Sequence, residues 1–245
     1  MPQCHDGDES SAAEMVEVGQ QIMDLIPDHP ACKEALGVVR ASLPASVVNH
    51  CLRVFLYAHA FSERKEDKPE EVSPIAAMPV KAHVLFVACI YHDLGVAAAF
   101  DEAGERFEVS GADAAARLLR RYGEDEASIR EAWLAISVHS SHGIANRMGG
   151  MVRALWWAVG VDFGAFPVPD LGVLGAELAS SSGWDVVEKE LPRLGVAKDL
   201  GDAVVRQCLH RPEKAPPNSW SALMLRAKKE EPDWDGVNKA FGAYD

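Results

Sequence analysis

The chain has 245 residues, of which 48% are hydrophobic and 25% charged, so it is long enough to bury the core of one large globular domain or two small ones. Its formal net charge of −13 repels nucleic acid and anionic membranes, and we expect neither as a partner. Five cysteines without CxxC spacing favour neither a disulfide framework nor a Cys-rich zinc site. Because the first 15 residues are acidic and unlike a targeting peptide, we expect a cytoplasmic protein.

Apolar residues recur at helical spacing along most of the chain, and no alternating strand pattern is found, which predicts an all-α fold. Residues 1–12 are polar and acidic, which predicts a disordered tail, and we expect 13–245 to form a single domain. In chain order, the predicted helices cover 14–26, 42–61 with Ser42 as N-cap, 82–99, 110–119 with Ser110 as N-cap, 127–142 and 151–166. Weaker helical patterns follow over 170–180, 184–191, 197–210 and 219–229. Residues 63–71 are predicted to be a solvated loop, and 100–110 a loop beside a pocket.

Four ionisable side chains occupy apolar positions of three predicted helices: His50, His92, Asp93 and Asp162. Burying such groups is costly unless they are paired or bind a metal. A single inward histidine is more often a satisfied core residue, and a single inward aspartate a cap or half of an ion pair. One divalent cation explains all four together, because imidazole nitrogens and carboxylate oxygens are common ligands. The sequence therefore predicts one divalent metal, with zinc preferred and iron or manganese as alternatives.

The order of these residues is similar to the H…HD…D signature of the HD-domain superfamily, an all-α metal-dependent fold. The stretches LPASVVNHCLRVF, FEVSGADAAARLL and VHSSHGIA resemble the cyanamide hydratase-like HD proteins. The resemblance implies an HD-domain helical bundle with additional C-terminal helices and a metal-binding core at about 40–165. It also implies that His50, His92, Asp93 and Asp162 are the metal ligands. Gly95 and Ser110 differ from residues that are frequent in that subfamily, so the resemblance does not identify the substrate.

Other residues near these motifs are candidates for catalysis and substrate binding. Asp93, Glu108 and His139 are the predicted catalytic residues, the last two for proton transfer. Glu108 is alternatively a carboxylate favoured by a helix N-terminus. Phe107, His142 and Trp157 are predicted to bind substrate, although aromatic residues at helical spacing are more often core, and His142 would also suit a helix C-terminus.

Four functions are compatible with these residues. The favoured one is a hydratase or lyase that adds water to a small neutral substrate with an electrophilic carbon, such as a nitrile, isonitrile or cyanamide. The main alternative is a phosphohydrolase acting on a nucleotide or other phosphate ester, which needs cations around the phosphate. A regulatory domain with a structural metal and a diiron oxygenase are the others; the latter needs additional ligands, for which only His139 and His142 are available. A homo-oligomer is compatible with the sequence.

Overall fold

The computed structural model describes residues 19–62, 79–166 and 183–233. Within these ranges the chain is helical and contains no strand, which confirms the predicted all-α class. The α-helices are α1 (Gln20–Asp24), α2 (Pro30–Ser42), α3 (Ala45–Ser62), α5 (Ala82–Tyr91), α6 (Phe107–Arg121), α7 (Glu126–Val138), α8 (Gly150–Asp162), α9 (Gly183–Glu190), α10 (Val196–His210) and α11 (Trp220–Glu230). Short 3-10 helices are η1 (Leu94–Val96), η2 (Ala98–Phe100), η3 (Ala145–Arg147) and η4 (Pro212–Lys214).

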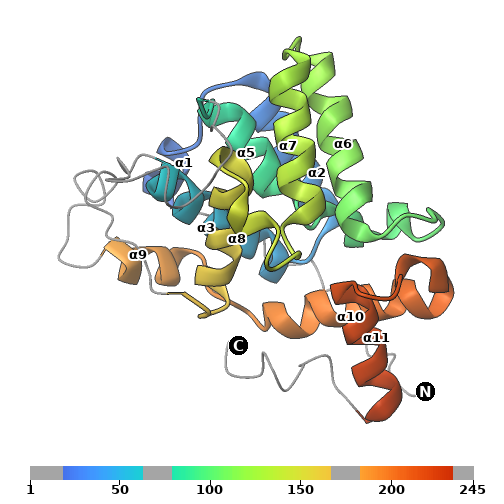
Figure 1. Ribbon diagram of the computed structural model, residues 1–245. Helices are drawn as coiled ribbons and strands as arrows, with labels where there is room; N and C mark the ends of the chain where they lie inside the picture. The colour runs from blue at the N-terminus through green and yellow to red at the C-terminus, as the bar shows by residue number, and fades with distance from the viewer. Residues whose placement is uncertain (1–18, 63–78, 167–182, 234–245) are drawn as a thin grey trace, which may run out of the picture.

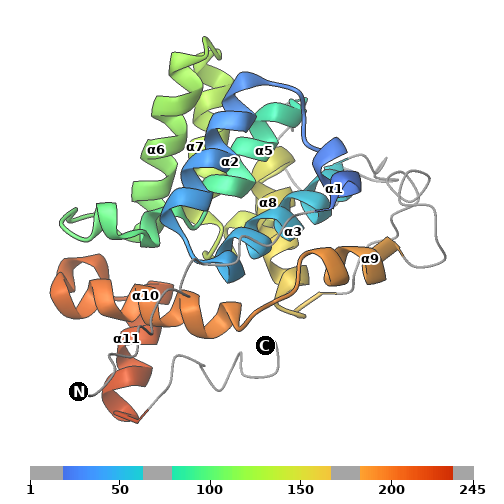
Figure 2. The same cartoon turned by 180° about the vertical axis from the view of Figure 1, so that it is seen from behind.

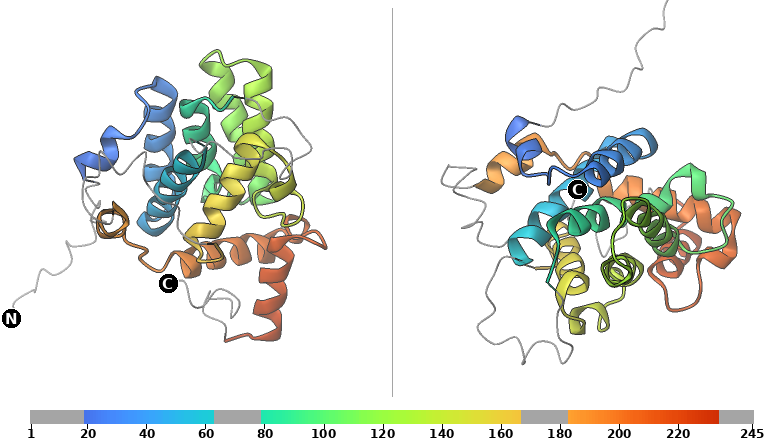
Figure 3. Two further views of the ribbon diagram at one scale, coloured as in Figure 1. Left: turned by 60° about the vertical axis from the view of Figure 1, so that its left-hand side comes forward. Right: turned by 90° about the horizontal axis from the view of Figure 1, so that it is seen from above.

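Helix α5 lies at the centre of the bundle, surrounded by α2, α3, α6, α7 and α8 (Figures 1 and 3). Every residue from Val84 to Tyr91 is buried. Because the helix is apolar around its whole circumference, it has no solvent face and must be covered on all sides. Its C-terminal end carries His92 and Asp93 into the interior of the molecule.

The C-terminal helices α9, α10 and α11 lie at one end of this bundle, and α10 crosses below it in both opposed views (Figures 1 and 2). Three buried polar residues on α3 bind the segment that joins α9 to α10 and the first turn of α10. Asn49 Nδ2 donates to the Pro192 carbonyl at 2.9 Å, Arg53 Nη1 donates to the Leu191 carbonyl at 2.8 Å, and the Ser46 hydroxyl donates to Asp199. Buried polar groups require such partners, so these bonds tie the C-terminal helices to the bundle.

One helix was not predicted, and several helix boundaries differ from the sequence prediction; among them, α7 ends at Val138 and α8 at Asp162, each four residues before the predicted end. Helix α2 was not predicted. Its N-cap is His29, whose Nδ1 accepts a hydrogen bond from the Ala31 amide. Ser42, which was predicted to cap the next helix, is instead the last residue of α2. Helix α5 ends at Tyr91, and the predicted stretch to residue 99 breaks into η1 and η2. Helix α6 begins at Phe107, so Ser110 lies buried inside it instead of capping it. The predictions for 1–12, 63–71 and 170–180 lie outside the described residues.

Among the residues that the structure describes, no helix combines the length and the apolar character that crossing a bilayer would require.

Candidate metal centre

Three of the four predicted metal ligands lie together in the interior. His50 comes from the middle of α3, and His92 and Asp93 follow the last residue of α5. His50 Nε2 is 3.1 Å from His92 Nε2 and 3.4 Å from Asp93 Oδ2, and His92 Nε2 is 3.0 Å from the same oxygen. All three residues are at most 1% exposed. One ligand atom from each lies within 4.8 Å of the others, a spacing at which they could share a metal ion.

The end of α5 explains how adjacent residues point to one place. His92 keeps helical angles (φ −60°, ψ −33°), whereas Asp93 has φ −106° and ψ 2°, in the bridge region where the helical path is left. On a continued helix, neighbouring side chains would project about 100° apart. Because the chain turns at Asp93 into η1, both side chains converge on His50.

The histidine hydrogen bonds determine which ring nitrogens are available. His92 Nδ1 donates to the Cys89 carbonyl at 2.6 Å, and His139 Nδ1 donates to the Ile136 carbonyl at 2.7 Å. A carbonyl oxygen only accepts, so the neutral rings are unprotonated at Nε2. His50 Nδ1 likewise faces a carboxylate oxygen of Asp162 at 2.6 Å. Since the Nε2 atoms of His50 and His92 are 3.1 Å apart, their lone pairs repel unless a metal ion or a proton lies between them.

The electrostatics of the cluster also favour a cation. Although burial opposes the charged form, hydrogen bonds and charges of Asp162 and Asp93 raise the pKa of His50. Burial likewise opposes ionisation of Asp93, but the adjacent imidazoles of His92 and His50 hold the pKa of Asp93 well below its usual range. The Oδ2 atom of Asp93 is buried and has no hydrogen-bond partner of acceptable geometry among the described residues. A divalent ion would satisfy this oxygen and both Nε2 atoms, so the donor set fits a metal.

Asp162 lies on the opposite side of the His50 ring from this cluster. Besides accepting from His50, it receives Arg53 Nε at 2.7 Å on Oδ1 and Arg53 Nη2 at 2.8 Å on Oδ2. Burial opposes ionisation, but Arg53 and His50 lower the pKa of the Asp162 carboxyl well below its usual range. The fourth predicted ligand is therefore placed to orient His50, as carboxylates commonly do for metal-binding histidines.

Two glycines allow α6 to approach the turn that carries His92 and Asp93. A Cβ on Gly95 would lie 2.0 Å from the Phe107 carbonyl oxygen, and a Cβ on Gly111 would lie 2.6 Å from the Tyr91 carbonyl oxygen. Both distances are far below van der Waals contact. The absence of side chains at these positions thus sets the distance between Phe107 and the cluster.

A cavity of about 130 Å³ opens beside the cluster. His50, His92 and Asp93 line it together with three of the predicted catalytic and substrate-binding residues, His139, Phe107 and His142. His139 Nε2 is 3.7 Å from Asp93 Oδ1, and burial, followed by the charge of His92, lowers the pKa of His139 to about 4. His139 is therefore neutral at pH 7 and presents an unprotonated Nε2. His142 is exposed, and its Nδ1 accepts from Trp156 Nε1 at 3.1 Å.

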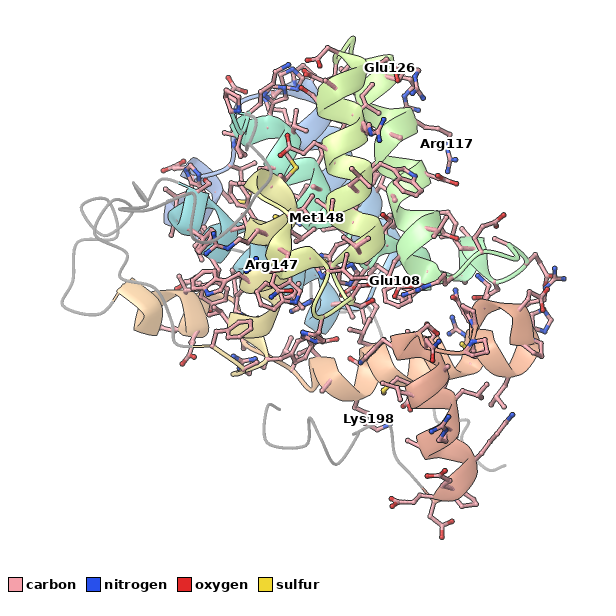
Figure 4. All side chains as sticks on the ribbon, viewed as in Figure 1. Glu108, Arg117, Glu126, Arg147, Met148 and Lys198 are labelled. Atoms are coloured by element: carbon pink, nitrogen blue, oxygen red, sulfur yellow. The ribbon has the colours of Figure 1, made fainter. Side chains whose placement is uncertain are left out.

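Two predicted site residues lie beside the cavity rather than in its lining. Glu108, at the end of α6 that lies near α10 (Figure 4), is fully buried and paired with the Arg106 guanidinium. Its Oε1 also accepts from the Ser140 hydroxyl at 2.6 Å, and Ser140 lines the cavity. Trp157 packs on Phe61 with ring centroids 4.7 Å apart, and its neighbour Trp156 lines the cavity instead.

Sequence reasoning missed the contribution of the C-terminal helices to the cavity. Ala197 and Leu200 on α10 and Trp220 and Met224 on α11 line it. Their apolar spacing predicted helices, but local sequence contains no signal for which core they join. Trp220 gives the clearest case, because its ring contacts Phe107 at a centroid distance of 5.9 Å across more than 100 residues.

Comparison with known proteins finds a family match over the central part of the chain. The family model described as the HD domain matches residues 47–156, which include His50, His92, Asp93 and His139. This match supports the HD-domain superfamily and agrees with the all-α fold and the buried cluster. A search of curated proteins finds no match to the chain.

Proposed function

We propose that this HD-domain chain is a metal-dependent hydratase of the lyase class. Its substrate is a small neutral molecule with an electrophilic carbon, of the nitrile, isonitrile or cyanamide type. The observation that carries the proposal is a single cavity that combines a buried His–His–Asp cluster with walls that are mostly apolar. Such a cavity suits a neutral substrate, because burying a charge without a partner is costly.

The cluster His50–His92–Asp93 would bind one divalent metal, for which zinc is our first choice and iron or manganese the alternatives. When bound, such a metal supplies Lewis acidity, which polarises a substrate heteroatom and makes water a nucleophile near neutral pH. Asp162 would keep the Nδ1 proton on His50 and so direct Nε2 toward the metal.

His139 would act as a proton acceptor in this reaction. Its Nδ1 proton is engaged by the Ile136 carbonyl, and its Nε2 atom faces Asp93 at 3.7 Å. A neutral ring with a free lone pair takes a proton from the attacking water and returns it to the substrate nitrogen. Glu108 would act indirectly, because both of its oxygens are occupied by Arg106 and Ser140.

Phosphate ester hydrolysis is the main alternative, because HD-domain proteins include phosphohydrolases. A metal-bound phosphate needs further donors for its remaining oxygens. Among the described residues that line the cavity, none is lysine or arginine. Two arginines near the motifs are engaged: Arg53 is bidentate to Asp162, and Arg106 is paired with Glu108. These contacts favour a neutral substrate over a phosphate ester.

The test is a direct comparison of substrate classes on metal-loaded protein. Acetonitrile, benzonitrile, cyanamide and an alkyl isonitrile are compared with nucleotides and a generic phosphate ester, with amide, urea or formamide formation and phosphate release as readouts. Asp93→Ala and His92→Ala should lose metal content and activity together. Phosphate release that disappears in His92→Ala, combined with no hydration of the neutral substrates, would transfer the assignment to phosphohydrolase.

A further inference from the structure

The part of the cavity formed by α10 and α11 contains no ionisable side chain, and apart from the indole N–H of Trp220 its side chains are apolar. Ala197, Leu200, Trp220 and Met224 provide it, and all four lie outside the HD match at residues 47–156. The cavity is thus built from two portions of the chain. The HD portion provides the ionisable groups, and the C-terminal helices provide mainly apolar surface.

A series of ring contacts leads from the ligand cluster to this apolar wall. The His139 ring lies 5.0 Å from His92, Phe107 lies 5.8 Å from His139, and Trp220 lies 5.9 Å from Phe107. The neighbouring rings meet at 67–90°, in edge-to-face arrangements that aromatic pairs prefer. The wall of α11 is therefore connected to the ligand cluster through Phe107 and His139.

Helix α10 is also fixed relative to the cluster. The buried Gln207 amide donates to the Gly95 carbonyl at 3.0 Å and to Asp101 Oδ1 at 3.0 Å. Lys214, which follows α10 and is 1% exposed, donates to the Glu105 carbonyl at 3.0 Å. Because these bonds reach the turn after Asp93 and the loop before Phe107, the apolar wall is held at a set distance from the cluster.

The size of the cavity limits what this wall accepts. Its volume is about 130 Å³, somewhat less than the roughly 150 Å³ of an apolar protein cavity that binds benzene. Because the reacting group must share this space, one six-membered ring is the upper limit for the apolar part of a ligand. Cyanamide and hydrogen cyanide have no hydrocarbon part to cover this surface. A hydrocarbon group of up to one six-membered ring would cover it and remove apolar area from water.

We infer that the substrate carries an apolar alkyl or aryl substituent no larger than about a benzene ring, seated against α10 and α11. This inference rests on the proposed function for the identity of the reacting group, but the apolar subsite itself is testable without turnover. The substrate class is therefore the substituted nitriles or isonitriles rather than cyanamide.

Binding of fluorobenzene to the full-length, zinc-loaded protein, measured by ¹⁹F NMR titration, tests the subsite. Leu200→Trp fills the α10 wall and should weaken fluorobenzene binding about tenfold or more, the range that one or a few methylenes produce in an apolar pocket. Leu209→Trp is the matched control, since Leu209 lies on the same helix and is 58% exposed. It should leave binding unchanged.

A second pair of variants covers the case in which Leu200→Trp does not fold. Met224→Ala enlarges the cavity and should shift the preference from fluorobenzene to 1-fluoronaphthalene about tenfold. Leu223→Ala, at a neighbouring position that is 56% exposed, should not shift it.

The outcomes separate the inference from the proposed reaction. If folded, zinc-loaded wild type does not bind fluorobenzene, or if both wall variants behave like their controls, the apolar subsite is wrong even where cyanamide is hydrated. If fluorobenzene binds and responds to both wall variants while no nitrile or isonitrile is hydrated, the subsite stands and the proposed reaction fails. A third outcome supports both the apolar subsite and the proposed reaction. In that case benzonitrile or an alkyl isonitrile is hydrated faster than cyanamide, and Leu200→Trp slows this hydration.

Discussion

His50 and Asp162 are joined by a 2.6 Å hydrogen bond between Nδ1 and Oδ2, on the side of the imidazole that faces away from Asp93. The bond fixes the proton of the neutral ring at Nδ1 and leaves the Nε2 lone pair directed at His92 and Asp93. Asp162 is thus placed to orient the His50 ring, and we propose that it acts as an outer partner of a metal ligand rather than as a ligand itself.

Replacing Asp162 with Asn should weaken zinc binding without abolishing it. The amide keeps the shape of the carboxylate but removes its charge, and outer partners of this kind typically change metal affinity about 10–100-fold. Zinc titration against a competing chelator, together with metal content at saturation, gives the result. We expect close to one zinc per chain in Asp162→Asn at saturation and little in Asp93→Ala. A complete loss of zinc from folded Asp162→Asn would instead indicate a direct ligand.

The ion pair of Arg53 and Asp162 should show strong coupling in the free energy of unfolding. Both side chains are fully buried, so Arg53→Met or Asp162→Asn alone leaves a charge without its partner, at a cost of roughly 3–5 kcal/mol. The double variant removes both charges and should cost much less than the sum of the single variants. Urea unfolding of the metal-free proteins measures the cycle. Additive effects would show that the pair does not act as a unit.

The three residues of the buried cluster could be predicted from the sequence, because the pattern that marks each of them is local. His50 shares the apolar stripe of its helix, and His92 and Asp93 interrupt a run that is otherwise entirely apolar. An ionisable residue at such a position needs a partner wherever the helix packs. The periodicity alone therefore indicated an interior polar site.

The side of His50 on which Asp162 lies was not predictable in the same way. Helical phase gives the face of a residue but not the rotation of its side chain, and Arg53 competes for the Asp162 carboxylate. The choice between Trp156 and Trp157 also depends on packing, because adjacent residues on α8 differ only by about 100°. The apolar wall of α10 and α11 depends on tertiary contacts such as Phe107 with Trp220, for which local sequence has no signal.

Gly111→Ala should disturb the metal centre although Gly111 touches no ligand atom of it. The new methyl would lie 2.6 Å from the Tyr91 carbonyl oxygen and 3.4 Å from that of His92, so α6 or the turn must move. We expect lower thermal stability and weaker zinc binding. Gly37→Ala is the matched control: a Cβ there meets nothing within 4 Å, and the helical, exposed position should gain about 0.5–1 kcal/mol. Equal effects of the two substitutions would contradict the close approach.

His139 and Glu108 should differ sharply in their effect on kcat, because only His139 lines the cavity. His139→Gln removes the proposed proton acceptor 3.7 Å from Asp93 Oδ1, and loss of such a group typically costs about 10²–10⁴-fold. Glu108→Gln keeps the length of the side chain and an oxygen that can still accept from the Ser140 hydroxyl, while it weakens the pairing with Arg106. We therefore expect Glu108→Gln to lower kcat less than tenfold and to lower the melting temperature, whereas His139→Gln should keep its zinc and its fold.

Steady-state kinetics on the nitrile that the substrate comparison selects, with metal content and thermal melts of both variants, measures this difference. A larger kcat loss in Glu108→Gln than in His139→Gln, at full zinc content, would move proton transfer to Glu108.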